Sequence, residues 1–151
     1  EHHNREVDEM TNQTRNEVLL EGIPVGAPEP SHENHGQLFY RQILEVPRLS
    51  GTADRLPLLV RQTQLPLLKE GVPLRVEGQL RSRSYGRADY LPVIAWGQVA
   101  SQVCTLEAGA PLSLEGRIQS RVYRKVTETG PEERTAYEVS VMRLLSPEDE
   151  P

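Results

Sequence analysis

Two short segments of the sequence combine arginine and tyrosine at odd spacing. Residues 81–85 read Arg-Ser-Arg-Ser-Tyr, and residues 121–125 read Arg-Val-Tyr-Arg-Lys. Alternate side chains of an extended strand point to the same face, so each segment presents cations and an aromatic ring together. Guanidinium groups contact phosphates and flat rings stack on bases, which is the chemistry that sequence-tolerant binding of single-stranded nucleic acid requires.

Other aromatic and basic residues extend this candidate surface. The residues that we assign to binding are Tyr40, Arg41, Arg48, Arg81, Arg83, Tyr85, Tyr90, Trp96, Arg121, Tyr123, Arg124 and Lys125. Trp96 follows an apolar stretch and also suits a core position, and the arginines also suit a solvated strand edge. Phe39 and Tyr40 alternate, so we assign Phe39 to the interior and Tyr40 to the surface, and Tyr137 to packing.

The formal net charge of −5 is unevenly distributed along the chain. Residues 1–40 carry eight acids and two arginines, residues 41–143 carry fifteen basic residues and eleven acids, and residues 144–151 carry three acids. Both ends are therefore acidic and the middle is basic. Fifteen of the seventeen basic residues are arginine, which favours a nucleic-acid partner for the middle segment.

No catalytic pattern accompanies these residues. The sequence contains no phosphate-binding loop, no Gly-x-Ser-x-Gly and no Cys–His signature. His32 and His35 have a spacing seen in metal sites, but zinc needs three or four ligands and no further histidine or cysteine lies near them. We therefore expect no enzyme, no catalytic residue, no metal and no cofactor. The single Cys104 and the lack of an apolar run of about 20 residues indicate a reducing, cytoplasmic setting without a membrane span.

Hydrophobic alternation predicts an all-β fold, a β-barrel with one or two short helices. The expected strands cover residues 17–25, 38–46, 56–62, 73–85, 90–96, 111–125 and 135–145. A helical turn within 64–70 and a helix at 98–106 are expected, and 26–36 and 47–54 are interpreted as turn and loop. Residues 1–15 are interpreted as a flexible tail and residues 146–151 as an acidic tail.

The chain contains two overlapping internal repeats. The pattern Gly-x-Pro-Leu-x-x-Glu-Gly-x-(Leu/Ile)-x-Ser-Arg-x-Tyr occurs at residues 71–85 and again at 109–123. The pattern Arg-x-x-Gly-x-Ala-Asp-x-Leu-Pro occurs at residues 48–57 and again at 83–92. A unit of hairpin, strand, short helix and strand therefore recurs, with half-repeats at about residues 46–85 and 81–124.

Three motifs in the second half carry a family resemblance. They are Tyr-Leu-Pro-Val-Ile-Ala-Trp-Gly at 90–97, Leu-Glu-Gly-Arg-Ile-Gln-Ser-Arg-x-Tyr at 114–123 and Glu-Arg-Thr-Ala-Tyr-Glu-Val at 133–139. Together they resemble the second half of bacterial single-stranded DNA-binding proteins, which have the OB fold. Residues 31–40 and 45–51 are similar to a divergent Gram-positive group of that family.

The resemblance implies an OB-type nucleic-acid-binding domain over residues 16–145, of about one and a half OB units. It implies single-stranded DNA as the partner, in DNA replication, recombination or repair, and a nucleoid-associated, cytoplasmic protein. Family members are commonly tetramers, so a homo-oligomer (dimer or tetramer) and possible replication or repair protein partners are also implied.

Two features depart from the family. The second unit lacks strands that match the first hairpin, so the barrel is composite, is completed by another subunit, or lacks a segment. The acidic end at 146–151 has no terminal aromatic residue, which puts recruitment of partners through it in doubt. The alternatives are a protein-interaction module or adaptor with little DNA affinity, and an RNA or oligosaccharide binder on the same fold.

Overall fold

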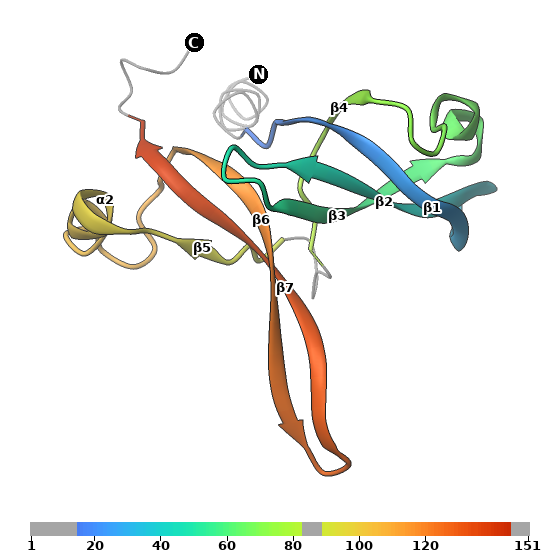
Figure 1. The fold of residues 1–151 in the computed structure, drawn as a ribbon. Coiled ribbons are helices and arrows are strands. Elements are labelled where there is room, and N and C mark those ends of the chain that lie inside the picture. The colour runs from blue at the N-terminus through green and yellow to red at the C-terminus, as the bar shows by residue number, and fades with distance from the viewer. Residues whose placement is uncertain (1–14, 83–88, 146–151) are drawn as a thin grey trace, which may run out of the picture.

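Two β-sheets make up most of the molecule (Figure 1). The computed structural model describes residues 15–82 and 89–145. The elements in chain order are β1 (Val18–Asn34), β2 (Gln37–Pro47), β3 (Ala53–Arg61), the 3-10 helix η1 (Gln62–Leu67), β4 (Leu74–Gly78), β5 (Val93–Ile94), α2 (Gly97–Val103), β6 (Leu114–Thr127) and β7 (Gly130–Leu144). The prediction of an all-β, OB-type fold with few short helices is confirmed.

The first sheet is a curled half-barrel with the strand order β3-β2-β1-β4. All neighbouring strands in it are antiparallel. Leu44 and Leu56 are buried on its inner face. β1 passes closely over β2 at Gly22, where a Cβ atom would collide with the carbonyl oxygen of Glu45, so the curl of this sheet requires glycine.

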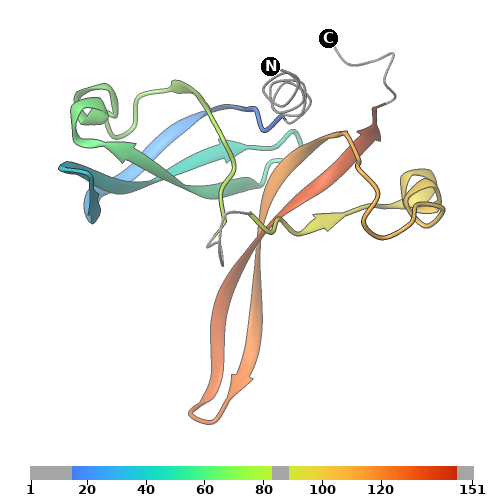
Figure 2. The ribbon, with the colours of Figure 1, turned by 180° about the vertical axis from the view of Figure 1, so that it is seen from behind.

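The second sheet has the strand order β5-β7-β6. β6 and β7 form a long hairpin, and its outer half, residues 121–136, projects away from both sheets (Figures 1 and 2). We call this projection the arm. On the inner half, β7 pairs in parallel with β5 at Val93–Val139 and Ile94–Ser140. The two sheets are therefore unequal, since the arm leaves much of the second one without a facing layer.

A buried ion pair joins the two sheets. Asp54, at the start of β3, has no exposed side-chain surface and accepts two hydrogen bonds from the guanidinium of Arg48. The backbone N–H of Ser120 on β6 donates to the same carboxylate at 2.9 Å, and the Nη2 atom of Arg117 lies 3.5 Å from it. A buried carboxylate needs such partners, so this cluster fixes where β6 crosses the first sheet.

The hydrogen bonds at this junction occur twice in the molecule. The N–H of Ser120 donates to Asp54, and the N–H of Arg55 donates to the Ser120 hydroxyl at 3.2 Å. Ser82 and Asp89 make the same two contacts, because the Ser82 N–H donates to Asp89 at 3.1 Å and the N–H of the next residue donates back to the Ser82 hydroxyl at 2.8 Å. We call each arrangement a clasp. The serines correspond in one sequence repeat and the aspartates in the other, so the clasps are the structural form of the repeats.

The observed strands are shorter than expected where a segment has no partner strand, and longer where pairing with the neighbouring strand extends further. Of the expected strand 73–85, residues 74–78 are strand and residues 79–82 are not, because β4 pairs with β1 no further than Val18; residues 83–85 lie outside the described part of the chain. Of the expected strand 90–96, residues 93–94 are strand. The expected turn at 26–36 belongs mostly to β1, which reaches Asn34 because two irregularities in register accommodate its prolines. The expected loop at 47–54 is also shorter, since β3 begins at Ala53. The tails at 1–14 and 146–151 lie outside the described residues.

Candidate nucleic-acid interface

Two large aromatic side chains flank β5 and are mostly exposed. Tyr90 and Trp96 each expose 70% of their surface. Trp96 has an extended backbone and lies immediately before α2, so the start of the helix ends the strand and turns the chain. The interpretation of Trp96 as a core residue is therefore wrong. Exposed rings of this size are available for stacking on a base.

The arm carries the second group of expected residues. The guanidinium carbon of Arg121 lies 5.6 Å from the ring centre of Tyr123, in a cation–π contact. Arg124 and Lys125 follow on β6 and are exposed. The expected arrangement of Arg121, Tyr123 and Lys125 on one face is consistent with the regular antiparallel register of this hairpin.

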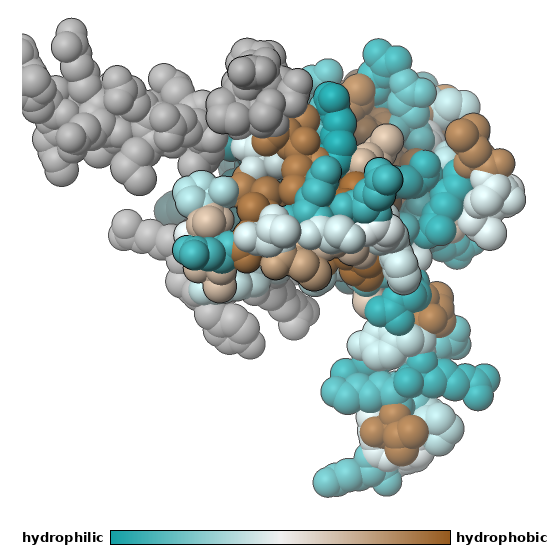
Figure 3. All heavy atoms as spheres, turned by 90° about the vertical axis from the view of Figure 1, so that its left-hand side faces the viewer, coloured by the Kyte–Doolittle hydropathy of each residue, from teal (hydrophilic) through white to brown (hydrophobic). Residues whose placement is uncertain are grey.

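Acidic residues lie opposite the cations of the arm. Arg124 pairs across the hairpin with Glu133, and Lys125 with Glu132. Nearer the sheet, Nε of Arg121 lies 3.3 Å from the carboxylate of buried Glu138. The arm is therefore a surface of mixed charge rather than a purely basic one. Figure 3 shows it as largely hydrophilic, with small apolar patches.

β2 places its two candidate residues on opposite faces. Tyr40 alternates with buried Gln42 and Leu44, so it lies on the inner face of the half-barrel and is half-buried. Arg41 is exposed on the other face. Phe39 stacks on His32, with ring centres 4.9 Å apart, and is half-buried as Tyr40 is, so burial does not distinguish an interior Phe39 from a surface Tyr40. These residues belong to the first sheet, whereas Tyr90 and the arm belong to the second.

Arg48 has a structural partner that the sequence did not reveal. Its guanidinium binds Asp54, which raises the pKa of Arg48. Burial by itself would raise the pKa of Asp54, but the hydrogen bonds from Arg48 and Ser120 outweigh it. With the charges of Arg48 and Arg117 nearby, the pKa of Asp54 lies below its usual range. The contact of Arg48 with nucleic acid stays a prediction.

Arg81 is exposed and donates a hydrogen bond to the side chain of Gln79 at 2.9 Å. Arg83 and Tyr85 lie outside the described residues. The cluster of Asp54, Ser120 and Arg117 was not predicted from the sequence. The signal was present, because both Asp54 and Ser120 are identities in the repeats, but nothing in the sequence shows that residues 66 positions apart meet.

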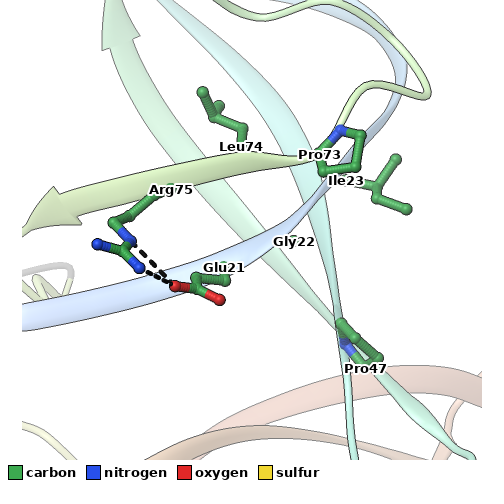
Figure 4. Close-up of a pocket in the computed structure, with 7 residues that line it drawn as sticks. All are labelled: Glu21, Gly22, Ile23, Pro47, Pro73, Leu74 and Arg75. Carbon is green, nitrogen blue, oxygen red and sulfur yellow. Dashed lines mark hydrogen bonds and ion pairs between the residues drawn. The ribbon is translucent and has the colours of Figure 1, made fainter.

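A hollow on the first sheet is formed by described residues. A shallow, mainly apolar hollow lies between β1 and the start of β4, lined by Gly22, Ile23, Pro47, Pro73 and Leu74, with the exposed Glu21–Arg75 ion pair beside it (Figure 4). In the described parts of the chain, no three metal-ligating side chains come together. No helix there has the length and apolar character to cross a membrane.

The comparisons with known proteins give similarity to solved structures. No protein-family model matches this chain, and no curated protein matches it. Among solved structures, it is similar to the dimeric N-terminal domain of PriB protein from Thermoanaerobacter tencongensis, with 42% identity, 47% of this chain and 79% of that chain covered, and a TM-score of 0.41.

Proposed function

We propose that this protein binds single-stranded DNA without sequence preference, by stacking bases on exposed aromatic rings and by contacting phosphates with arginine. The observation that carries the proposal is the 70% exposure of both Tyr90 and Trp96. A large ring on the surface forfeits the free energy of burial, roughly 1.5–3 kcal/mol for a side chain of this size, unless a ligand covers it.

Cations lie within the same sheet as these rings. β5, which they flank, pairs with β7, and β7 forms the arm with the strand that bears Arg121, Arg124 and Lys125. A strand of DNA that stacks on the rings can therefore continue along the arm. The resemblance of residues 90–97, 114–123 and 133–139 to bacterial single-stranded DNA-binding proteins supports a role in DNA replication.

Further parts of the proposal rest on the same resemblance. We infer roles in recombination and repair, a homo-oligomeric state, a cytoplasmic location and the lack of enzymatic activity. The dimeric state of the PriB domain supports the homo-oligomer. The narrower membership of a Gram-positive group of single-stranded DNA-binding proteins is supported by residues 31–40 and 45–51.

Fluorescence of Trp96, the single tryptophan, tests the proposal directly. Titration with poly-dT should quench it strongly at low salt, and the affinity should fall steeply as salt rises because counterions are released from the DNA. Tyr90→Ala should weaken binding by about 1–3 kcal/mol, the contribution of one stacked base. Leu49→Ala is the matched control, since Leu49 is fully exposed and lies on the hairpin of the first sheet. Unchanged fluorescence and no binding at low salt would contradict the proposal.

A further inference from the structure

The repeats give the molecule two pairs of strand edges with matching sequences. Residues 71–85 correspond to 109–123, so β4 corresponds to β6. Residues 48–57 correspond to 83–92, so β3 corresponds to the segment that leads into β5. In the second sheet, β7 lies between β6 and β5 and pairs with both. In the first sheet, β4 and β3 are the two outer strands, and the described residues add no strand between them.

The glycines of β6 and β4 show that β6 has a close neighbouring strand where the described part of the chain gives β4 none. A Cβ atom at Gly116 on β6 would lie 2.5 Å from the carbonyl oxygen of Ser140 and 2.8 Å from a methyl group of Val139, both on β7. Gly78 is the counterpart of Gly116 in the repeat, and no described residue lies within 4 Å of a Cβ built there. Glycine weakens a strand unless another backbone approaches closely. Gly78 is therefore suited to the close approach of a backbone that the described residues do not supply.

Two prolines that correspond in the repeat, Pro92 and Pro57, also differ in whether a neighbouring strand binds their carbonyl groups. The carbonyl oxygen of Pro92 accepts a hydrogen bond of 2.9 Å from the N–H of Val139 on β7. Its counterpart is Pro57 on β3. The N–H of Arg55 points out of the sheet edge toward Ser120, and backbone groups alternate along a strand, so the carbonyl of Pro57 points out of this edge as well.

The strand directions are also compatible. β7 runs antiparallel to β6 and parallel to β5. Because β3, β2, β1 and β4 are antiparallel neighbours in turn, β3 and β4 run in opposite directions. A single added strand can therefore be antiparallel to β4 and parallel to β3, as β7 is to their counterparts.

We propose that the outer edges of β3 and β4 bind an extended strand of a partner protein whose sequence follows that of β7. The strand presents a carbonyl to Gly78 and an N–H to Pro57, and it carries small or β-branched side chains at alternate positions, as Val139 and Val141 do in β7. Strand addition of this kind takes its affinity from main-chain hydrogen bonds and its specificity from alternate side chains. It also covers Leu58 and Val76, which are half-buried on strands β3 and β4.

The chain's own β7 shows which chemistry fits these residues, because the matching residues on β6 and before β5 already bind it. A second copy of the chain is a poorer occupant. Each copy has one β7, and transferring it to a neighbour would leave its own β5 and β6 without it. The inference does not depend on the DNA-binding proposal, and its test uses no DNA.

A labelled peptide of residues 136–145 tests the inference on the full chain. Fluorescence anisotropy should show saturable binding to the wild-type protein. Gly78→Val should weaken it roughly tenfold or more, the loss expected when at least one hydrogen bond and its close approach are removed. Gln79→Val, next to it and exposed, is the matched control and should bind the peptide as the wild type does.

A second peptide keeps the test independent of protein folding. Methylation of the backbone nitrogen at the Val139 position removes the hydrogen bond to Pro57, so the wild-type protein should bind this peptide roughly tenfold more weakly. Equal binding of the peptide to wild type and Gly78→Val, or no saturable binding at all, would overturn the inference. The inference would also be overturned if the wild-type protein were a dimer that does not bind the peptide and if Gly78→Val dissociated that dimer, since the occupant of the edges would then be a second copy.

Discussion

At the scale of single residues, the junction between the sheets depends on the carboxylate of Asp54. Its replacement by an amide would leave Arg48 and Arg117 beside a buried group without charge. We expect Asp54→Asn to lower the free energy of unfolding by about 2–3 kcal/mol at neutral pH, somewhat less than for a fully buried pair because Arg48 is partly exposed. Urea unfolding measures this. Glu21→Gln, which breaks an exposed ion pair, is the control and should change stability by less than about 0.5 kcal/mol.

The same substitution should change the response to acid. The pKa of Asp54 is lower in the folded protein than its ordinary value of 3.8. Its contribution is therefore complete above that value and is lost as the pH falls through the lower, folded pKa. The difference in stability between wild type and Asp54→Asn should shrink below about pH 4. A difference that stays constant down to pH 2 would contradict this assignment.

The residue types of the candidate interface could be predicted from the sequence, but their partners could not. Alternation in strands correctly placed Arg121, Tyr123 and Lys125 in one extended segment. The burial of Tyr40 and the engagement of Arg48 depend on which strands curl over which, and local spacing holds no information on that. The prediction therefore succeeded where a side chain depends on its own strand alone.

At the scale of elements, Gly116 and Gly78 occupy equivalent positions in the repeat, but a neighbouring strand lies close to Gly116 and none of the described residues lies close to Gly78. Gly116→Ala would force a methyl group against β7, so we expect it to lower the free energy of unfolding by about 2–3 kcal/mol. Gly78→Ala, its counterpart in the repeat, meets open space among the described residues and should change stability by less than about 0.5 kcal/mol. Thermal or urea unfolding of the two variants compares them directly, and equal effects would contradict the structural difference between β4 and β6.

The charges of the arm should tune DNA affinity in opposite directions. Replacing Arg124 and Lys125 together by glutamine removes two cations, which should reduce the slope of log affinity against log salt by about 1.4 for single-stranded DNA. Replacing Glu132 and Glu133 together by glutamine removes the acids opposite them and should raise affinity. Salt titrations of the Trp96 signal measure both. If neither pair changes the affinity, the arm lies outside the DNA path.

The elements could be predicted better than their pairing. The segments that became β2, β3, β6 and β7 were each expected within a few residues, as was α2. The expected strand at 90–96 was too long, and residues 79–82 of the expected strand at 73–85 are not strand, because alternation of side chains shows that a segment can be a strand and not how much of it finds a partner.

At the scale of the whole molecule, the small core sets the stability. Among the described residues, the buried apolar side chains are Pro24, Leu44, Leu56 and Val141, whereas large apolar residues such as Leu19, Leu59 and Met142 are exposed. With so little buried apolar surface, the isolated chain is expected to have a small free energy of unfolding, to which binding would add.

We therefore expect the melting temperature to rise with protein concentration, as it does for an oligomer, and to rise further with oligo-dT. At a hundred times its dissociation constant the ligand should add about 2.7 kcal/mol. Differential scanning calorimetry over a range of concentrations measures both effects. A melting temperature independent of protein concentration and of oligo-dT would show that the isolated monomer is stable by itself.

The two clasps also set an order for folding. The contact between Ser82 and Asp89 closes a loop of seven residues, whereas that between Asp54 and Ser120 closes one of 66. The shorter loop costs about 2 kcal/mol less chain entropy to close, since this cost grows with the logarithm of loop length. The contact between Ser82 and Asp89 is therefore expected to form before Ser82 can make a hydrogen bond with Asp54. Asp54 then remains for Ser120, so the join between the two sheets belongs to the slow, non-local part of folding.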